Sequence, residues 1–263
     1  MIGGDHSSPD GAALTLLRLR IKAWVDRQYA RGTLWGKSVR ALHLLAWRCR
    51  IICKILIFRP RALFSLGEGD LDPARYPSLR LRIFGHRVLK EILPACRSVG
   101  FRPFLTCGTL LGFRRENQFI RDDADIDLGL MEEDRGRVSL LEDRLRRTGY
   151  KVRMKNEYFI SFRKPVYDDI HVDFFYHFHQ DGQVFTVTPD GETLLKYFHT
   201  ADVFANLAPV RFYGQPILVP GETEKYLTQK YGNWEIPRRD LDPRDKGDYP
   251  NLMIEGPGGR PVS

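Results

Sequence analysis

Three aspartates occupy alternate positions of one short segment, at Asp123, Asp125 and Asp127. On an extended strand, side chains two residues apart point to the same side of the sheet, so these carboxylates can act together. Carboxylate oxygens are ligands that divalent cations take in proteins, and we expect Asp125 and Asp127 to bind one jointly. A single D-x-D pattern also occurs in charged edge strands and solvated loops, so other parts of the chain must decide between the two interpretations.

A glycine-threonine step precedes the aspartates, at Gly108 and Thr109 in the segment PFLTCGTLLGF. The segment predicts a short buried strand that turns into a helix at the glycine. Gly108 allows a phosphate to approach the backbone closely, and Thr109 offers a hydroxyl and an N-cap at the helix start. The step therefore predicts an anion-binding turn, although a glycine between a strand and a helix is also ordinary turn chemistry.

A fourth carboxylate, Asp173, lies 46 residues after Asp127 in the segment DDIHVDFFYHF. Strand alternation places five residues on one face: Asp169, His171, Asp173, Phe175 and His177. An unpaired buried carboxylate is costly, so Asp173 needs a metal, a proton or a cation as its partner. A structural salt bridge meets this requirement as well as a catalytic site does.

These features follow the order of parts in the polymerase-beta-like nucleotidyltransferase fold. More narrowly, the chain resembles the LicD family, which includes bacterial phosphocholine transferases and the C-terminal domains of fukutin and fukutin-related protein. The family motif runs approximately G-T-L-L-G-x-x-R-x-x-x-F-I-P-W-D-x-D-x-D, and residues 108–127 read GTLLGFRRENQFIRDDADID. A closing segment, VRFYGQPILVPGETEKYLTQKYGNW, also resembles the family. The resemblance covers residues 78–236 and departs from the motif where Arg121 and Asp122 replace Pro-Trp.

The resemblance implies an α+β fold with a nucleotidyltransferase-like mixed sheet flanked by helices. It also implies a phosphotransferase that takes a substituted phosphate from a CDP-linked alcohol, such as CDP-choline or CDP-ribitol. The acceptor would be a sugar hydroxyl of a lipopolysaccharide, capsule or teichoic-acid chain, and CMP would leave.

Each candidate residue has an expected role in that chemistry. Mg²⁺ or Mn²⁺ is expected on Asp125, Asp127 and Asp173, with Asp173 as a further ligand or as the base for the acceptor hydroxyl. The residues expected to be catalytic are Asp125, Asp127, Asp173 and Arg115. The residues expected to bind substrate are Gly108, Thr109, Arg115, Asp123, Arg163 and Lys164.

Three other functions use the same residues differently. A nucleotidyltransferase acting on a nucleoside triphosphate would release pyrophosphate instead of CMP. A glycosyltransferase would use D-x-D to bind a metal and a nucleotide sugar, but it requires neither the Gly-Thr turn nor a strand carboxylate like Asp173. A catalytically inactive adaptor would bind no nucleotide in the presence of Mg²⁺.

The basic charge is concentrated near the N-terminus. The whole chain of 263 residues has a net charge of +8, whereas residues 18–61 carry twelve Lys or Arg and one acid, Asp26. Apolar residues follow a helical spacing on one face of this segment: Leu42, Leu45, Cys49, Ile52, Cys53 and Leu56. The segment predicts an amphipathic helix on an anionic membrane surface, with packing on the catalytic domain as the alternative. Nucleic acid is a less favoured partner, since no recognisable motif accompanies the charge.

Composition divides the chain into five parts. We expect a disordered start over 1–13, the basic helical segment over 14–66, a linker over 67–77, the catalytic domain over 78–236 and an extended tail over 237–263. The four cysteines form no C-x-x-C pair, which favours buried thiols in a reducing compartment. The expected location is therefore the cytoplasmic face of an inner membrane, or a Golgi lumen in a eukaryote.

Periodicity gives the expected elements of the domain. Helices are expected over 78–93, 132–149, 191–198 and 221–232, and strands over 150–165 and around Asp173. The sequence QDGQ at residues 180–183 predicts a hairpin turn.

Overall fold

The computed structural model describes residues 34–58, 72, 76–238 and 241–257, and the chain divides into two units, residues 1–67 and 68–263. The expected disordered start over 1–13 lies outside the described residues, as does most of the expected linker over 67–77.

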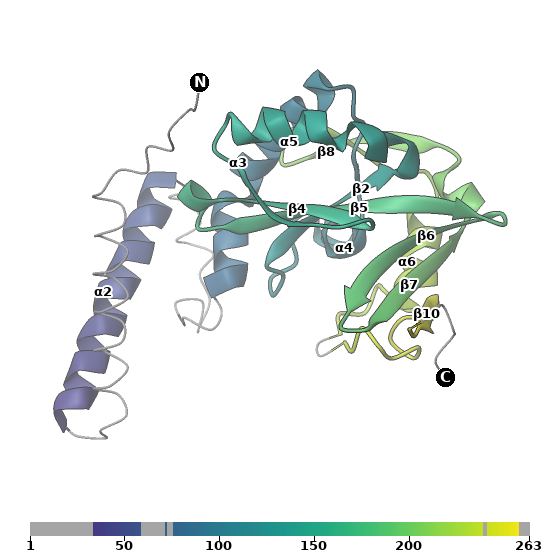
Figure 1. The fold of residues 1–263 in the computed structure, drawn as a ribbon. Helices are drawn as coiled ribbons and strands as arrows, with labels where there is room; N and C mark the ends of the chain where they lie inside the picture. Colours follow the sequence, from purple (N-terminus) through teal and green to yellow (C-terminus); the bar gives the residue numbers. More distant parts are fainter. Residues whose placement is uncertain (1–33, 59–71, 73–75, 239–240, 258–263) are drawn as a thin grey trace. The chain divides into compact units, whose positions relative to one another are not determined.

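The described part of the first unit is one helix, α2 (Leu34–Phe58), drawn in purple in Figure 1. Several of its apolar side chains are exposed: Leu42, Leu45, Leu56 and Ile57. Cys49 and Cys53 are exposed as well, so the expectation of buried thiols is wrong for these two cysteines. Among the described residues, no helix is both long enough and apolar enough to cross a membrane.

The second unit contains a ten-stranded mixed sheet. Its strands run in the order β10-β7-β6-β5-β2-β1-β9-β8, while β4 pairs with β5 and β3 pairs with β4. The strands are β1 (Phe104–Leu105), β2 (Asp125–Met131), β3 (Lys151–Lys155), β4 (Phe159–Lys164), β5 (Ile170–Gln180), β6 (Gln183–Asp190), β7 (Thr193–Thr200), β8 (Leu207–Phe212), β9 (Gln215–Pro220) and β10 (Leu252–Glu255). The long strand β5 joins the two parts of the sheet, because its start pairs with β2 and β4 and its end pairs with β6.

Helices lie on both faces of this sheet, which agrees with the expected α+β fold of a mixed sheet flanked by helices. They are α3 (Tyr76–Ser98), α4 (Cys107–Glu116), α5 (Val138–Arg146) and α6 (Thr223–Tyr231), with short 3₁₀ helices at Glu132–Arg137, Pro165–Tyr167 and Ala201–Phe204. In Figure 1, α5 lies on one side of the layer formed by β4 and β5, and α4 lies on the other. Helix α3 contacts α5, β2 and β5, whereas α6 contacts β7 and β9.

Alternation along β2 separates the core from the carboxylates. Ile126, Leu128 and Leu130 are fully buried on one face of the strand. Asp125 and Asp127 point to the opposite face, because successive side chains of a strand alternate. The burial of the apolar set therefore fixes the face on which the carboxylates lie.

Three expected features differ from the structure. Residues 193–200 form β7 instead of a helix, because the turn at Gly191 folds them back onto β6. Residues 132–137 form a 3₁₀ helix ahead of α5 instead of a continuous α-helix. The tail contributes β10, which pairs with β7. The hairpin turn at residues 180–183 is confirmed, with positive φ at Asp181 and Gly182.

Candidate active site at the β2–α4 corner

Three carboxylates converge at the start of β2. Asp123, Asp125 and Asp127 each offer an oxygen, and these oxygens all lie within 4.8 Å of one another. Asp127 is 8% exposed and is the most enclosed of the three. The expected partnership of Asp125 and Asp127 is thus present in the geometry, and Asp123, which was expected to bind substrate, lies in the same cluster.

The first turn of α4 closes the cluster from one side. The Gly108 N–H donates to Asp127 Oδ2 at 3.0 Å. A Cβ at Gly108 would lie 2.6 Å from Asp123 Oδ2 and 3.3 Å from Asp127 Oδ2. Glycine is therefore required here for a close approach of backbone to carboxylate. The close approach of a phosphate to Gly108 stays a prediction.

Thr109 has a different role from the one expected. Its Oγ1 accepts a hydrogen bond from the Asp127 N–H at 2.8 Å, and the side chain is fully buried. Helix α4 begins at Cys107 with Thr106 as its N-cap residue, so Thr109 is not the N-cap. The N-cap thus lies three residues earlier than the sequence suggested, and Thr109 links α4 to β2 instead.

A tyrosine of α6 supports the turn between β1 and α4. The Tyr226 hydroxyl hydrogen-bonds Thr106 Oγ1 at 2.7 Å and accepts from the Cys107 N–H at 3.2 Å. Cys107 has a φ of 47°, a left-handed conformation that is unusual for a residue with a side chain. The distant α6 therefore helps to hold the strained turn that presents Gly108.

Two motif residues hold the loop that carries Asp123. Phe119 is 3% exposed and stacks on Tyr213, with ring centroids 4.9 Å apart. At Gly112, a Cβ would lie 2.4 Å from the Gln118 backbone oxygen, so only glycine allows the loop to pass this close to α4. Phe119 and Gly112 therefore act on the carboxylates indirectly, through the position of the loop.

Asp173 lies beside the cluster on the neighbouring strand. In the parallel pairing of β2 with β5, Asp173 is in register with Asp127. In the antiparallel pairing of β5 with β4, it is in register with Ser161, whose hydroxyl donates to Asp173 Oδ1. Residues in register on adjacent strands share a face at a strand spacing of about 4.8 Å, so Asp127, Asp173 and Ser161 form one row across the sheet.

Burial raises the pKa of three carboxylates here, Asp123, Asp127 and Asp173, and the charge of Asp125 adds to the effect. Burial, followed by the charge of Asp125, raises the pKa of Asp123 to about 8. The same two causes raise the pKa of Asp127 well above its usual value. For Asp173, burial raises the pKa to about 6 against an opposing hydrogen bond from Ser161.

The donor set fits a divalent cation. Asp123 Oδ2 is buried without a hydrogen-bond partner, and it points to the space beside Gly108 and Asp127. Oxygen ligands from several carboxylates are the set that Mg²⁺ and Mn²⁺ prefer. Asp123, Asp125 and Asp127 are therefore the residues that can hold such an ion, with Asp173 adjacent.

Arg115, Arg163 and Lys164 are the three cations expected to contact substrate. Of these, Arg163 lies on the face of the sheet that carries the aspartates. Arg163 is in register with His171 on β5, which is in register with Asp125 on β2. Its guanidinium forms an ion pair with Asp169 at 3.1 Å. Arg115 lies in the last turn of α4, seven residues after Gly108, which separates the two by about 10 Å along the helix axis. A contact between Arg115 and substrate stays a prediction.

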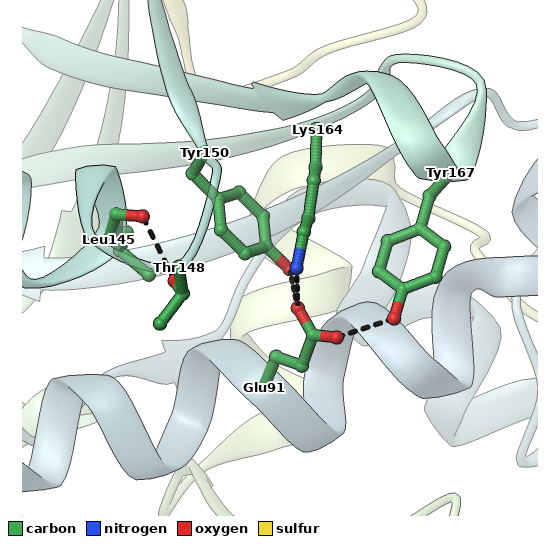
Figure 2. Close-up of polar contacts among 6 residues, drawn as sticks. All are labelled: Glu91, Leu145, Thr148, Tyr150, Lys164 and Tyr167. Carbon is green, nitrogen blue, oxygen red and sulfur yellow. Dashed lines mark hydrogen bonds and ion pairs between the residues drawn. The ribbon is translucent and has the colours of Figure 1, made fainter.

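Lys164 lies on the opposite face of the sheet, which contradicts its expected role. Its Nζ pairs with Glu91 of α3 at 2.7 Å, and the Tyr150 and Tyr167 hydroxyls donate to the same carboxylate (Figure 2). Adjacent strand residues point to opposite faces, so only one of Arg163 and Lys164 can face the aspartates. Lys164 joins β4 to α3 instead.

Comparison with known proteins identifies the domain that carries this site. The family described as LicD/FKTN/FKRP, nucleotidyltransferase domain, matches residues 100–222. This part of the chain belongs to the LicD family. The LicD domain contains the Gly108 turn, the three clustered aspartates and Asp173. It ends before α6, so Tyr226 lies outside the matched residues.

Two solved structures are similar to this chain. One is a crystal structure of ANT(2")-Ia in complex with adenylyl-2"-tobramycin, with 19% identity over 52% of this chain and 69% of that chain, and a TM-score of 0.34. The other is a solution structure of the antibiotic-resistance factor ANT(2")-Ia, with 18% identity over 53% of this chain and 66% of that chain, and a TM-score of 0.36. The search of curated proteins gave no match.

Sequence analysis missed two polar residues of the site, Ser161 and Tyr226. Ser161 hydrogen-bonds Asp173, but only the register of β4 against β5 brings the two together. Tyr226 reaches the turn at Cys107 from 119 residues away. Neither carries a local sequence signal, since both depend on long-range pairing.

Proposed function

We propose that the LicD domain is a metal-dependent phosphotransferase that moves a substituted phosphate from a CDP-linked donor to a sugar hydroxyl. The observation that carries the proposal is the convergence of Asp123, Asp125 and Asp127 beside Gly108, with Asp173 in register next to Asp127. The LicD resemblance supports a transferred group of the phosphocholine or ribitol-phosphate kind and a lipid-linked cell-surface glycan as the acceptor.

The aspartate cluster would hold Mg²⁺ or Mn²⁺ in this reaction. When bound, the ion would neutralise charge on the donor diphosphate, which is the main requirement of phosphoryl transfer. The positive end of the α4 helix dipole favours an anion at the same place. The chain thus offers carboxylates for the ion and a helix N-terminus for the phosphate on one side of the site.

Asp173 is the proposed base. Its pKa of about 6 leaves it ionised at neutral pH and close to the range in which proton transfer is efficient. Asp173 would take the proton of the acceptor hydroxyl as the oxygen bonds to the distal phosphorus and CMP leaves. The Ser161 hydroxyl, which donates to Asp173 Oδ1, orients the carboxylate for this task.

The test is release of CMP. Purified protein with Mg²⁺, a CDP-linked alcohol and a glycan acceptor should release CMP, measured by chromatography, and Asp125→Asn should reduce the rate to background. Asp143→Asn is the matched control, because Asp143 is an exposed carboxylate on α5. Metal-dependent release of CMP that survives Asp125→Asn would refute the assignment of the site.

A second candidate is a nucleotidyltransferase acting on a nucleoside triphosphate. The matched family description names a nucleotidyltransferase domain, which supports this second candidate. The same carboxylates would then direct attack to the inner phosphorus. Pyrophosphate release from a nucleoside triphosphate, with no CMP from any CDP-linked donor, would select this alternative.

We further propose that α2 lies on an anionic membrane surface, peripheral to the membrane. Exposed Leu42 and Leu45 on this helix, and exposed Arg48 and Arg50 nearby, support the proposal. Basic residues near anionic lipid contribute on the order of 1 kcal/mol each. The protein should co-sediment with phosphatidylglycerol vesicles. Salt and the substitution Leu45→Glu should each weaken this binding. Equal sedimentation with neutral and anionic vesicles would contradict the electrostatic part of the proposal.

A further inference from the structure

Three cationic side chains gather beside Asp173 on the outer strands of the sheet. Lys151 of β3 is in register with Arg163 of β4, so both share the face that carries the aspartates. Arg153 is the third, two residues after Lys151. We call Lys151, Arg153 and Arg163 the cationic corner.

A β-bulge determines the position of Arg153. Val152 is paired with Phe162 and Met154 with Ser161, so the register shifts by one residue between them. Arg153 is the extra residue, and it lies with Met154 opposite Ser161. The bulge therefore adds an arginine next to Ser161, the residue that hydrogen-bonds Asp173. Bulges beside active sites commonly redirect a side chain in this way.

The charges of the corner are only partly balanced. Arg163 pairs with Asp169 at 3.1 Å. Within the described ranges, no carboxylate lies within ion-pair distance of Lys151 or Arg153, and both side chains are exposed. Arg153 acts on the site electrostatically, because its charge opposes the burial that raises the pKa of Asp173. The corner thus presents positive charge within reach of the proposed base.

The order of groups across the sheet defines two sides of the site. The aspartate cluster and the start of α4 lie on the β2 side of Asp173, and β4 and β3 lie on the other. If the donor diphosphate occupies the β2 side, the acceptor hydroxyl must reach Asp173 from the side of β4 and β3. The groups that the acceptor meets there are Ser161 and the cationic corner.

We propose that the acceptor glycan carries an anionic group, a phosphate or a carboxylate, near the hydroxyl that is modified, and that the cationic corner binds this group. The proposal rests on the proposed function and adds the chemical class of the acceptor. Two strand spacings separate β5 from β3, so the anion lies within about 10 Å of the attacking oxygen. Arginine is suited to this contact, because its planar guanidinium can bind phosphate or carboxylate with two hydrogen bonds.

The test compares matched acceptors. A sugar phosphate, the corresponding uronic acid and the neutral sugar are assayed with one CDP-linked donor, and an anionic acceptor should have a KM at least tenfold lower than the neutral sugar. Arg153→Ala should raise the KM for that acceptor about tenfold, with a much smaller change in the KM for the donor, and Arg153→Lys should restore part of the loss. Arg147→Ala is the control, because Arg147 is an exposed arginine at the end of α5.

Direct binding separates failure of this inference from failure of the proposed function. The affinity of the sugar phosphate for the full chain is measured by calorimetry, which requires no turnover. Loss of affinity in Arg153→Ala supports the anion site even if no donor releases CMP, an outcome that would count against the proposed function alone. Equal KM values for anionic and neutral acceptors, or equal affinity of the sugar phosphate for the wild type and Arg153→Ala, would overturn the inference.

Discussion

At the scale of single residues, the close approach of backbone to carboxylate decides which positions of the site tolerate substitution. Gly108 brings a backbone N–H within 3.0 Å of Asp127 Oδ2 and leaves no room for a Cβ beside Asp123. The aspartates themselves are common residues. It is the missing side chain at Gly108 that allows them to meet the start of α4.

Gly108→Ala should therefore abolish metal binding while the fold survives. The new methyl group would displace the Asp123 and Asp127 carboxylates, and overpacking of this kind costs about 1–3 kcal/mol. Metal binding is measured by calorimetry with Mn²⁺, and folding by circular dichroism. Gly136→Ala is the control, because a Cβ there meets no atom within 4 Å. Wild-type Mn²⁺ affinity in Gly108→Ala would show that the cluster does not depend on this contact.

At the scale of elements, a half-buried polar network joins α3 to the face of the sheet opposite the aspartates. Glu91 accepts hydrogen bonds from Lys164, Tyr150 and Tyr167, which come from β4 and the segments around it (Figure 2). Burial alone would raise the pKa of Glu91, but the hydrogen bonds from Lys164 and Tyr167 outweigh it and lower the pKa. The network therefore favours the ionised carboxylate in the folded protein.

Glu91→Gln should lower the free energy of unfolding by about 2 kcal/mol at pH 7, the value of hydrogen bonds to a charged group. A lowered pKa stabilises the fold above the pKa of the unfolded chain, and this contribution disappears as pH falls through the folded value. The difference between Glu91→Gln and wild type should thus shrink between pH 7 and pH 3 in urea titrations. Glu192→Gln, at an exposed position, is the control. A difference that does not vary with pH would mean that the charge of Glu91 is not what stabilises the network.

At the scale of the whole molecule, the clustered carboxylates link stability to pH and to metal. The pKa of Asp123 is raised to about 8, first by burial and then by the charge of Asp125. A raised carboxyl pKa stabilises the fold below the pKa of the unfolded chain, and that contribution is lost as pH rises through the folded value. The metal-free protein should therefore lose stability from this group between about pH 4 and pH 8.

A bound cation should reverse that loss, because metal binding requires deprotonated ligands. The increase in Tm caused by Mg²⁺ or Mn²⁺ should be larger at pH 8 than at pH 6, measured by thermal denaturation at fixed metal concentration. Asp123→Asn should reduce this dependence on pH. The same increase in Tm at both pH values would argue against protonation of the cluster in the metal-free protein.

The sequence alone determined which residues form the core of the site. The alternating aspartates and the Gly108 step are local patterns, and strand periodicity places Asp125 and Asp127 on one face without knowledge of any partner strand. The LicD resemblance then gave the family of the domain, which the match over residues 100–222 confirms. Local patterns also predicted α3, α6 and the hairpin after β5.

Only the tertiary structure decided the rest, because register and long-range pairing leave no local signal. The register of β5 between β2 and β4 brings Asp173 to Asp127 and to Ser161, and the bulge in β3 adds Arg153. The same pairing separates Arg163 from Lys164, which are adjacent in sequence and lie on opposite faces of the sheet. Residues 193–200 became a strand because β6 and β10 pair with them, and these contacts outweigh the helical preference of their sequence.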